Sequence, residues 1–140
     1  MASGYPDFEG GKRRVYLTAD WAAEVGIDKS FDAWNVAAAS LALATIDYTV
    51  PAGKTLYIEQ AMAQSRAVVA ADRELNQIVH LEVYDVTAGV YYTELGGNGG
   101  CVTHYPVPIK IIAGHRVLIS VINGSNHNCQ IIVVAHGYEV

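Results

Sequence analysis

Residues 107–140 read VPIKIIAGHRVLISVINGSNHNCQIIVVAHGYEV, and this stretch decides the fold class of the chain. Its runs of Ile and Val are separated by two polar breaks, Ala113-Gly114-His115 and Asn123–Asn128. β-branched side chains fit a pleated sheet, while Gly and Asn allow the chain to turn. The pattern therefore predicts three antiparallel strands. They are Cys101–Ile112, Arg116–Asn123 and Cys129–Glu139.

The same rhythm of strands and turns extends toward the N-terminus. Pro51–Lys54 has the Pro and Gly of a β-turn, whereas Ala67–Asn76 and the glycine-rich Gly96–Gly100 are predicted to be loops. The further segments with strand character are Arg13–Ala19, Leu41–Val50, Leu56–Met62, Gln77–Val86 and Val90–Leu95. About eight strands with frequent turn signals predict an all-β protein, a single jelly-roll β-sandwich.

The chain of 140 residues is long enough for one domain. Residues 1–12 are predicted to form an extended N-terminal arm, and residues 13–140 the sandwich. The segment Asp20–Ser40 differs from the rest, because it is rich in Ala and contains two tryptophans. Asp20 suits the N-cap of a short helix through Val25, ended by Gly26, and Ser30 that of another through Ala39, so we expect either a helical insertion or a long ordered loop.

Composition indicates that the chain buries more surface than its own core requires. Charged residues make up only 16% of the sequence and apolar residues 51%. Three runs are apolar on both faces, whereas a strand with one solvated face should alternate. These runs are Ile109–Ala113 (interrupted by Lys110), Val117–Ile122 (interrupted by Ser120) and Ile131–Ala135. We therefore expect their outer faces to be covered, by a neighbouring subunit or by the segment Asp20–Ser40.

Charge and hydropathy argue against two classes of partner. The net charge is −5, and Lys12-Arg13-Arg14 is the longest basic run, so binding to nucleic acid is not expected. No apolar run approaches the ~18 residues of a membrane span. The polar N-terminus resembles neither a signal peptide nor an anchor, which predicts a protein made and kept in a cytoplasm.

No motif predicts catalysis, a metal or a cofactor. The five histidines include no His-x-His pair, and His127 with Cys129 falls short of the three or four ligands that zinc requires. Neither a nucleophile elbow nor a phosphate-binding loop is present. Cys101 and Cys129 open strands that would not be neighbours in a jelly roll, so both are predicted to be free, partly buried thiols.

Aromatic residues are the best candidates for a functional surface. Tyr84, Tyr91, Tyr92 and Tyr105 are predicted to cluster on two hairpins around the glycine loop. Tyrosine is enriched in protein interfaces because it is large, rigid and amphipathic. Stacked aromatic rings also bind sugars. The four tyrosines therefore predict an oligomer interface or a glycan site.

Two turn phrases, Tyr48–Ile58 and Pro106–Val117, and the ending Gly137–Val140 resemble small virion proteins of tailed bacteriophages. The resemblance covers residues 41–140 and is to jelly-roll capsid decoration (cement) proteins and related fibre modules. It implies a homotrimer on the capsid exterior that binds the major capsid protein and stabilises the shell, without catalytic residues.

If the chain is a capsid decoration protein, the N-terminal arm is expected to contact the capsid. The contact residues would be Tyr5, Phe8, Lys12, Arg13 and Arg14. A carbohydrate-binding β-sandwich module of a phage fibre or decoration is the alternative function. An enzyme of the cupin or hydrolase type is a third.

Overall fold

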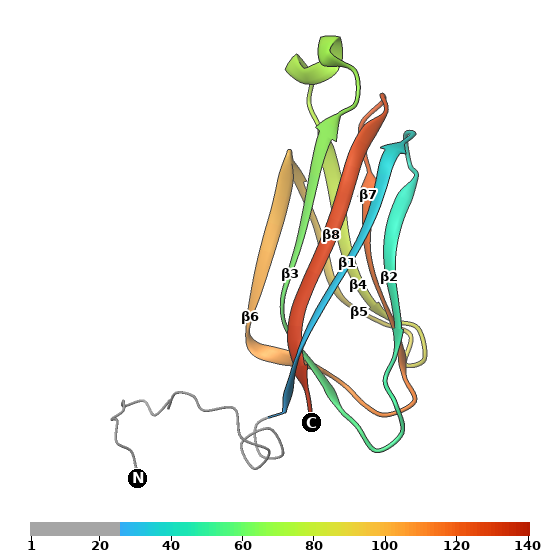
Figure 1. Cartoon of the computed structure of the whole chain (residues 1–140), viewed down its shortest axis with the longest axis vertical. Coiled ribbons are helices and arrows are strands. Elements are labelled where there is room, and N and C mark those ends of the chain that lie inside the picture. The colour runs from blue at the N-terminus through green and yellow to red at the C-terminus, as the bar shows by residue number, and fades with distance from the viewer. Residues whose placement is uncertain (1–25) are drawn as a thin grey trace, which may run out of the picture.

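The computed structural model describes residues 26–140, which form a β-sandwich of two sheets (Figure 1). The sheets have the strand orders β1-β8-β3-β6 and β2-β7-β4-β5. The strands are β1 (Ile27–Ala38), β2 (Leu43–Thr49), β3 (Leu56–Ala67), β4 (Ile78–Asp85), β5 (Val90–Asn98), β6 (Gly100–Ile111), β7 (Arg116–Asn123) and β8 (Cys129–Glu139), with a short 3-10 helix η2 (Ala70–Glu74). The prediction of an all-β sandwich of about eight antiparallel strands is confirmed.

The strand pairing is that of one long hairpin rolled onto itself. β1 pairs with β8, β2 with β7, β3 with β6 and β4 with β5, so the turn between β4 and β5 is the tip of the hairpin. Rolling brings β8 against β3 and β7 against β4, which completes both sheets. This connectivity defines a jelly roll.

The core lies between the sheets and follows from alternation along each strand. Val117, Ile119 and Val121 of β7 are buried, and so are Ile131 and Val133 of β8. The alternate residues of both strands face outward and are less buried. Burying one apolar side of each strand holds the two sheets together, since aligned sheets pack about 10 Å apart with interdigitating side chains.

The prediction of a helix between Ser30 and Ala39 is wrong, because this segment belongs to strand β1. It pairs with β8 over nearly its whole length, from Ile27 opposite Glu139 to Ala38 opposite Cys129. Alanine has the highest helix propensity, but propensity is a small effect, and backbone pairing with a buried central strand overrides it. Because residues 27–38 form a strand within one sheet, they do not cover the outer face of either sheet, although this segment is one of the two covers expected for the apolar strands. The predicted strand Arg13–Ala19, the predicted helix after Asp20 and the arm lie outside the described residues.

The prediction of a loop over Gly96–Gly100 is also wrong. β5 continues to Asn98 and β6 begins at Gly100, so only Gly99 separates the two strands, with a φ of 82°. A Cβ at Gly97 would lie 2.2 Å from the carbonyl oxygen of Gly100. The glycines therefore permit a tight crossing from one sheet to the other instead of a flexible loop, since β5 and β6 lie in different sheets. The predicted loop Ala67–Asn76 contains η2, and β3 is longer than predicted.

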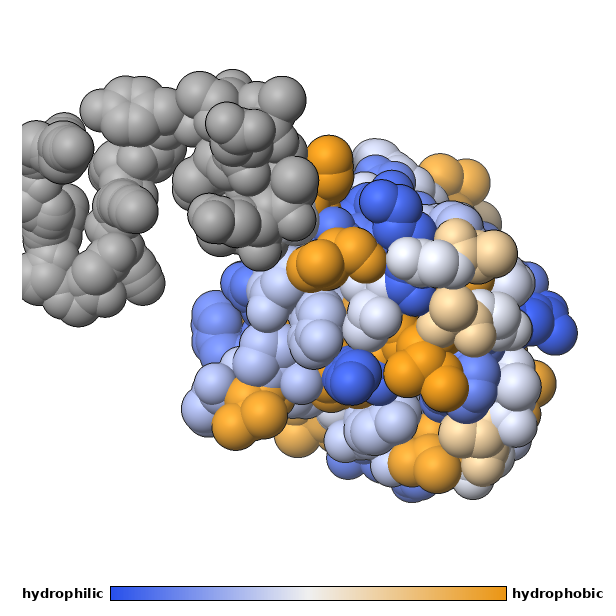
Figure 2. All heavy atoms as spheres, turned by 90° about the horizontal axis from the view of Figure 1, so that it is seen from below, coloured by the Kyte–Doolittle hydropathy of each residue, from blue (hydrophilic) through white to orange (hydrophobic). Residues whose placement is uncertain are grey.

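The end of the sandwich where β1 begins is closed by a polar cluster. Glu139, 6% exposed, accepts a hydrogen bond from the hydroxyl of Tyr48 at 2.8 Å, and its other oxygen lies 3.3 Å from the Lys29 ammonium. These contacts join β8 and β1 of one sheet to β2 of the other. Viewed from this end, apolar side chains are scattered among polar ones (Figure 2). This view therefore shows no continuous apolar patch.

Candidate functional site

A hollow of about 440 Å³ opens on the outer side of the β1-β8-β3-β6 sheet, where the pairing register of β3 shifts against both β6 and β8. Along β3 and β6, Ile58 pairs with Ile109 but Gln60 already pairs with His104. The four residues 105–108 of β6 therefore face Glu59 alone. Two of the four are prolines, which have no N–H to donate to a sheet and favour such bulges. The sequence thus opens a gap between two otherwise paired strands.

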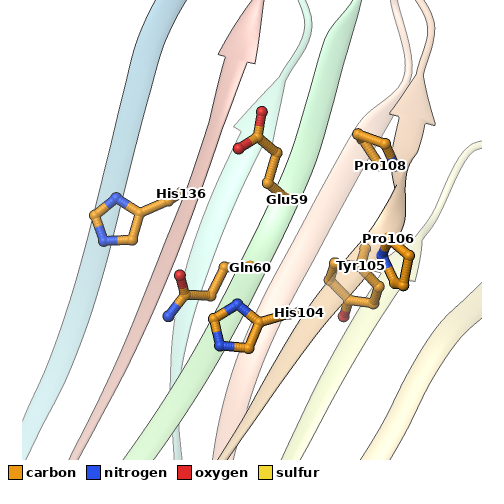
Figure 3. A pocket seen from close by; sticks show the side chains of 7 residues that line it. All are labelled: Glu59, Gln60, His104, Tyr105, Pro106, Pro108 and His136. Carbon is orange, nitrogen blue, oxygen red and sulfur yellow. The ribbon is translucent and has the colours of Figure 1, made fainter. Parts of the chain in front are cut away.

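The rim of the hollow is a row of polar side chains from three strands. Figure 3 shows Gln60 of β3 between His104 of β6 and His136 of β8, in agreement with the strand register. The Nδ1 of His136 lies 3.1 Å from the hydroxyl of Ser30. Within residues 26–140, the side chains of Gln60 and His104 form no hydrogen bond. The complete lining is Glu59, Gln60, His104, Tyr105, Pro106, Pro108 and His136.

Aromatic rings lie beside and beneath this polar row. Tyr57 and Tyr138, paired across β3 and β8, stack with ring centroids 5.0 Å apart and planes at 17°. Burial and the nearby Glu59 carboxylate raise the pKa of the Tyr138 hydroxyl. Tyr105 is half-buried, and burial raises its pKa although its hydroxyl forms a hydrogen bond with that of Thr93 in β5. Because Thr93 belongs to the opposite sheet, this bond directs the Tyr105 ring toward the space between the sheets, where Tyr105 packs against the core.

Sequence reasoning identified only Tyr105 among the residues that line the hollow. The other residues come from strands far apart in the chain, and each is unremarkable where it stands in the sequence. The available signal was Pro106-Val107-Pro108 inside a predicted strand, because proline within a sheet indicates an edge strand or a bulge. That signal places the bulge but does not name the residues opposite it.

The structure separates the four predicted tyrosines into two groups. Tyr84 and Tyr91 stack at a centroid distance of 4.2 Å, on the outer side of the β2-β7-β4-β5 sheet. Tyr92 is the extra residue of a bulge in β5 and is 41% exposed. Tyr105 lies on the other sheet, in the hollow. Burial and then the Glu82 carboxylate raise the pKa of the Tyr91 hydroxyl.

The stacked tyrosines belong to a larger surface, here called the tyrosine face. Strand register places Tyr84 beside Leu118, and Ile122 beside Leu43. Glu82 and Glu94 lie directly opposite each other across β4 and β5, an unfavourable arrangement for like charges. Neither forms an ion pair with another residue of the described chain. The tyrosine face consists of Leu43, Glu82, Tyr84, Tyr91, Tyr92, Glu94, Leu118 and Ile122.

The outer side of the opposite sheet carries a second apolar surface, the apolar band. Its most exposed member is Trp34 of β1, at 58%, which pairs with Ile132 of β8. The next row along the strands joins Val134, Met62 and Val102. The apolar band therefore crosses all four strands of this sheet, next to the row that contains Gln60.

The remaining candidate residues have structural surroundings. The ring of His127 and the thiol of Cys129 both lie near the side-chain oxygen of Gln77, at 3.4 and 3.6 Å. Cys101 and Cys129 are free, as predicted. Among residues 26–140, no three His, Cys, Asp or Glu side chains gather into a potential metal site. The arm residues Tyr5, Phe8, Lys12, Arg13 and Arg14 lie outside the described part of the chain.

His115 has a structural partner that makes stability depend on pH. Its Nδ1 lies 2.8 Å from Oδ2 of Asp85, which is 2% exposed, and the other carboxylate oxygen accepts the backbone N–H of Ala88. Burial alone would raise the pKa of Asp85, but the hydrogen bonds from His115 and Ala88 outweigh it and hold this pKa below the usual range. A carboxyl whose folded pKa is lowered stabilises the fold above its unfolded pKa, and this stability is lost as pH falls through the folded value.

We therefore expect Asp85→Asn to lower the free energy of unfolding at pH 7 by about 2 kcal/mol, the loss of a hydrogen bond to a buried charge. The difference from wild type should shrink as pH falls below about 3.9, the unfolded pKa of aspartate. Urea unfolding from pH 7 to pH 2.5 measures both. Asp47→Asn is the control, because its ion pair with Arg116 is exposed and should contribute far less. A pH-independent difference for Asp85→Asn would contradict the assignment.

Comparison with known proteins returned no relative: no protein-family model and no curated protein matches the chain. In the part of the chain that the structure describes, no helix has the length and apolar character needed to cross a membrane.

Proposed function

We propose that this chain is a structural virion protein, a capsid decoration (cement) protein that binds the lattice of the major capsid protein as a homotrimer. Its place would be the capsid exterior, after synthesis in the host cytoplasm. The jelly-roll fold agrees with the family that the turn phrases resemble, and the proposal assigns the protein no catalytic role.

The outer surfaces of β7 and β8 are the observation that carries this proposal. Both strands bury one apolar side between the sheets and present further Leu, Ile and Val side chains on the other. The two sheets are the only layers formed by residues 26–140, so no element of this region covers those outer sides. Burial of such surface against a second protein stabilises an assembly.

The tyrosine face is the surface that we assign to contacts between copies. Tyr91 and Tyr92 are 52% and 41% exposed, and tyrosine is among the residues most enriched in interfaces. The opposed carboxylates of Glu82 and Glu94 would gain from a cation supplied by a neighbouring copy. The N-terminal arm, with Tyr5, Phe8 and the basic run Lys12–Arg14, is assigned to the capsid.

Light scattering on single variants tests the assignment of the interface. The wild-type protein should have three times the 15.1 kDa mass of one chain, about 45 kDa. Leu118→Asp places a charge on the tyrosine face and should shift the mass to that of a monomer. Trp34→Ser, the matched control in the apolar band, should leave the trimer intact. A monomeric wild type would overturn the trimer, and dissociation by Trp34→Ser alone would move the interface to the apolar band.

Binding to capsids that lack the protein tests the proposed partner. Removing residues 1–14 should reduce the amount of protein bound to particles. Light scattering should still give a mass of three shortened chains. A triple serine variant of Lys12, Arg13 and Arg14 separates the contribution of charge from that of the aromatic residues. Undiminished binding of the shortened chain would show that the arm is not the capsid contact.

A further inference from the structure

We propose that the hollow between β3 and β6 binds a neutral sugar unit, which would give the protein a glycan-binding site separate from its subunit contacts. The sequence predicts an oligomer interface or a glycan site at the tyrosines of positions 84, 91, 92 and 105. Tyr84 and Tyr91, however, stack on each other and so each occupies one face of the other's ring. The hollow offers a cavity, free polar groups and the apolar surface of two prolines together.

The size and openness of the hollow suit a terminal sugar. Its volume of about 440 Å³ falls within the roughly 300–1,000 Å³ of typical ligand pockets. It lies on the outer side of a sheet, with Glu59, His104 and His136 exposed at its rim. One sugar unit can therefore enter the hollow while the remainder of a glycan extends into solvent.

The polar groups match sugar hydroxyls in kind. A hydroxyl both donates and accepts hydrogen bonds, and so does the amide of Gln60, while the imidazole of His104 adds two ring nitrogens that can form hydrogen bonds. Neither side chain has a hydrogen-bond partner in the described chain, so a sugar would displace only water. The Glu59 carboxylate adds an acceptor. No Lys or Arg lines the hollow, which favours a neutral sugar over an acidic one.

The apolar groups match the C–H surface of a sugar ring. Pro106 and Pro108 line one side of the hollow together with Tyr105 of the same strand, whose ring packs against the core (Figure 3). Tyr57 and Tyr138, which stack on each other, lie farther along the sheet beyond Glu59. Proline side chains lose almost no rotamer freedom on binding, so contact with the two prolines would cost little side-chain entropy.

The hollow and the tyrosine face lie on opposite sheets, with β3 and β6 in one sheet and β4 and β5 in the other. A neighbouring copy seated on the tyrosine face would leave the hollow open to solvent. The sugar site therefore stands or falls independently of the proposed trimer.

Titration with methyl glycosides, followed by NMR chemical shifts of the full chain, tests the site. The probes are the methyl glycosides of glucose, galactose, mannose and N-acetylglucosamine, each raised to about 50 mM, since a single sugar unit is expected to bind with a Kd near 1 mM. At least one should shift the signals of Gln60, His104 and Tyr105 in a saturable way. Gln60→Ala and His104→Ala should each weaken its binding at least tenfold.

Gln64→Ala is the matched control, because Gln64 lies on the same strand and the same face, beside Ile132 and away from the hollow. It should bind the sugar as wild type does, and thermal unfolding should confirm that all three variants are folded. Absence of binding by every neutral probe would overturn the proposal. Equal weakening of binding by Gln64→Ala would also overturn it. Sialic acid is titrated as an acidic probe, and binding of sialic acid alone would overturn the proposal by indicating an anion site.

Discussion

Replacing Gly137 by alanine is expected to lower the free energy of unfolding by about 3 kcal/mol, the upper end of the usual cost of overpacking. A Cβ at Gly137 would lie 2.0 Å from the carbonyl oxygen of Tyr57 and 2.9 Å from its carbonyl carbon. These are backbone atoms of β3, the strand paired with β8 at this point. Relief would require the two central strands to separate beside the bulge at Glu59.

A turn glycine provides the control for this effect. Gly114 has a φ of 82°, but a Cβ there would meet no atom within 4 Å. Gly114→Ala should therefore cost only the strain of a left-handed conformation, about 1 kcal/mol. Urea unfolding of both variants gives the comparison. If Gly137→Ala proved no more destabilising than Gly114→Ala, the close approach of β8 to β3 would be incorrect.

Asn123→Ala is the second substitution expected to have a large effect, again about 3 kcal/mol. Asn123 has no exposed surface, and its amide nitrogen donates to the carbonyl oxygens of Ala38 and His127 at 2.9 Å and of Ala39 at 3.2 Å. Its side-chain oxygen accepts the backbone N–H of Ser125. Alanine would leave several of these backbone groups unpaired, at about 1–3 kcal/mol for each group that stays buried.

The end of β7 and the loops around it should be affected most. Hydrogen exchange should therefore quicken near Ala38 and Ser125 before the rest of the sandwich responds. Asn126→Ala, in the exposed part of the same loop, is the control and should change stability by no more than about 0.5 kcal/mol. A similarly small loss for Asn123→Ala would mean that water replaces the amide.

The strands from β2 onward could be predicted from sequence because their signals are local. In Pro51–Lys54 and around Gly114, turn residues separate β-branched runs, and each run has the length of a strand. β1 could not be predicted in this way. Its alanines have little preference for strands, and it is a strand because β8, about a hundred residues later in the chain, pairs with it.

The same distinction between local signals and long-range strand pairing applies to the candidate sites. The exposure of Tyr91 and Tyr92 follows from their place on an edge strand, and a local pattern can suggest that. The hollow arises from a register shift between β3 and β6, which sets Glu59 against four residues of β6. Pairing register depends on the whole sheet, so no short motif could assemble Gln60, His104 and His136.

The rolled hairpin also governs the order in which the chain can fold during synthesis. β8 is the last of the eight described strands to leave the ribosome. It is a central strand that pairs with both β1 and β3. Until it emerges, β1 has no strand partner in its sheet and one edge of β3 is open. Such edges invite pairing with other chains. A nascent chain is therefore most exposed to misassembly just before its final strand appears, and conditions that slow the end of translation should lower the soluble yield.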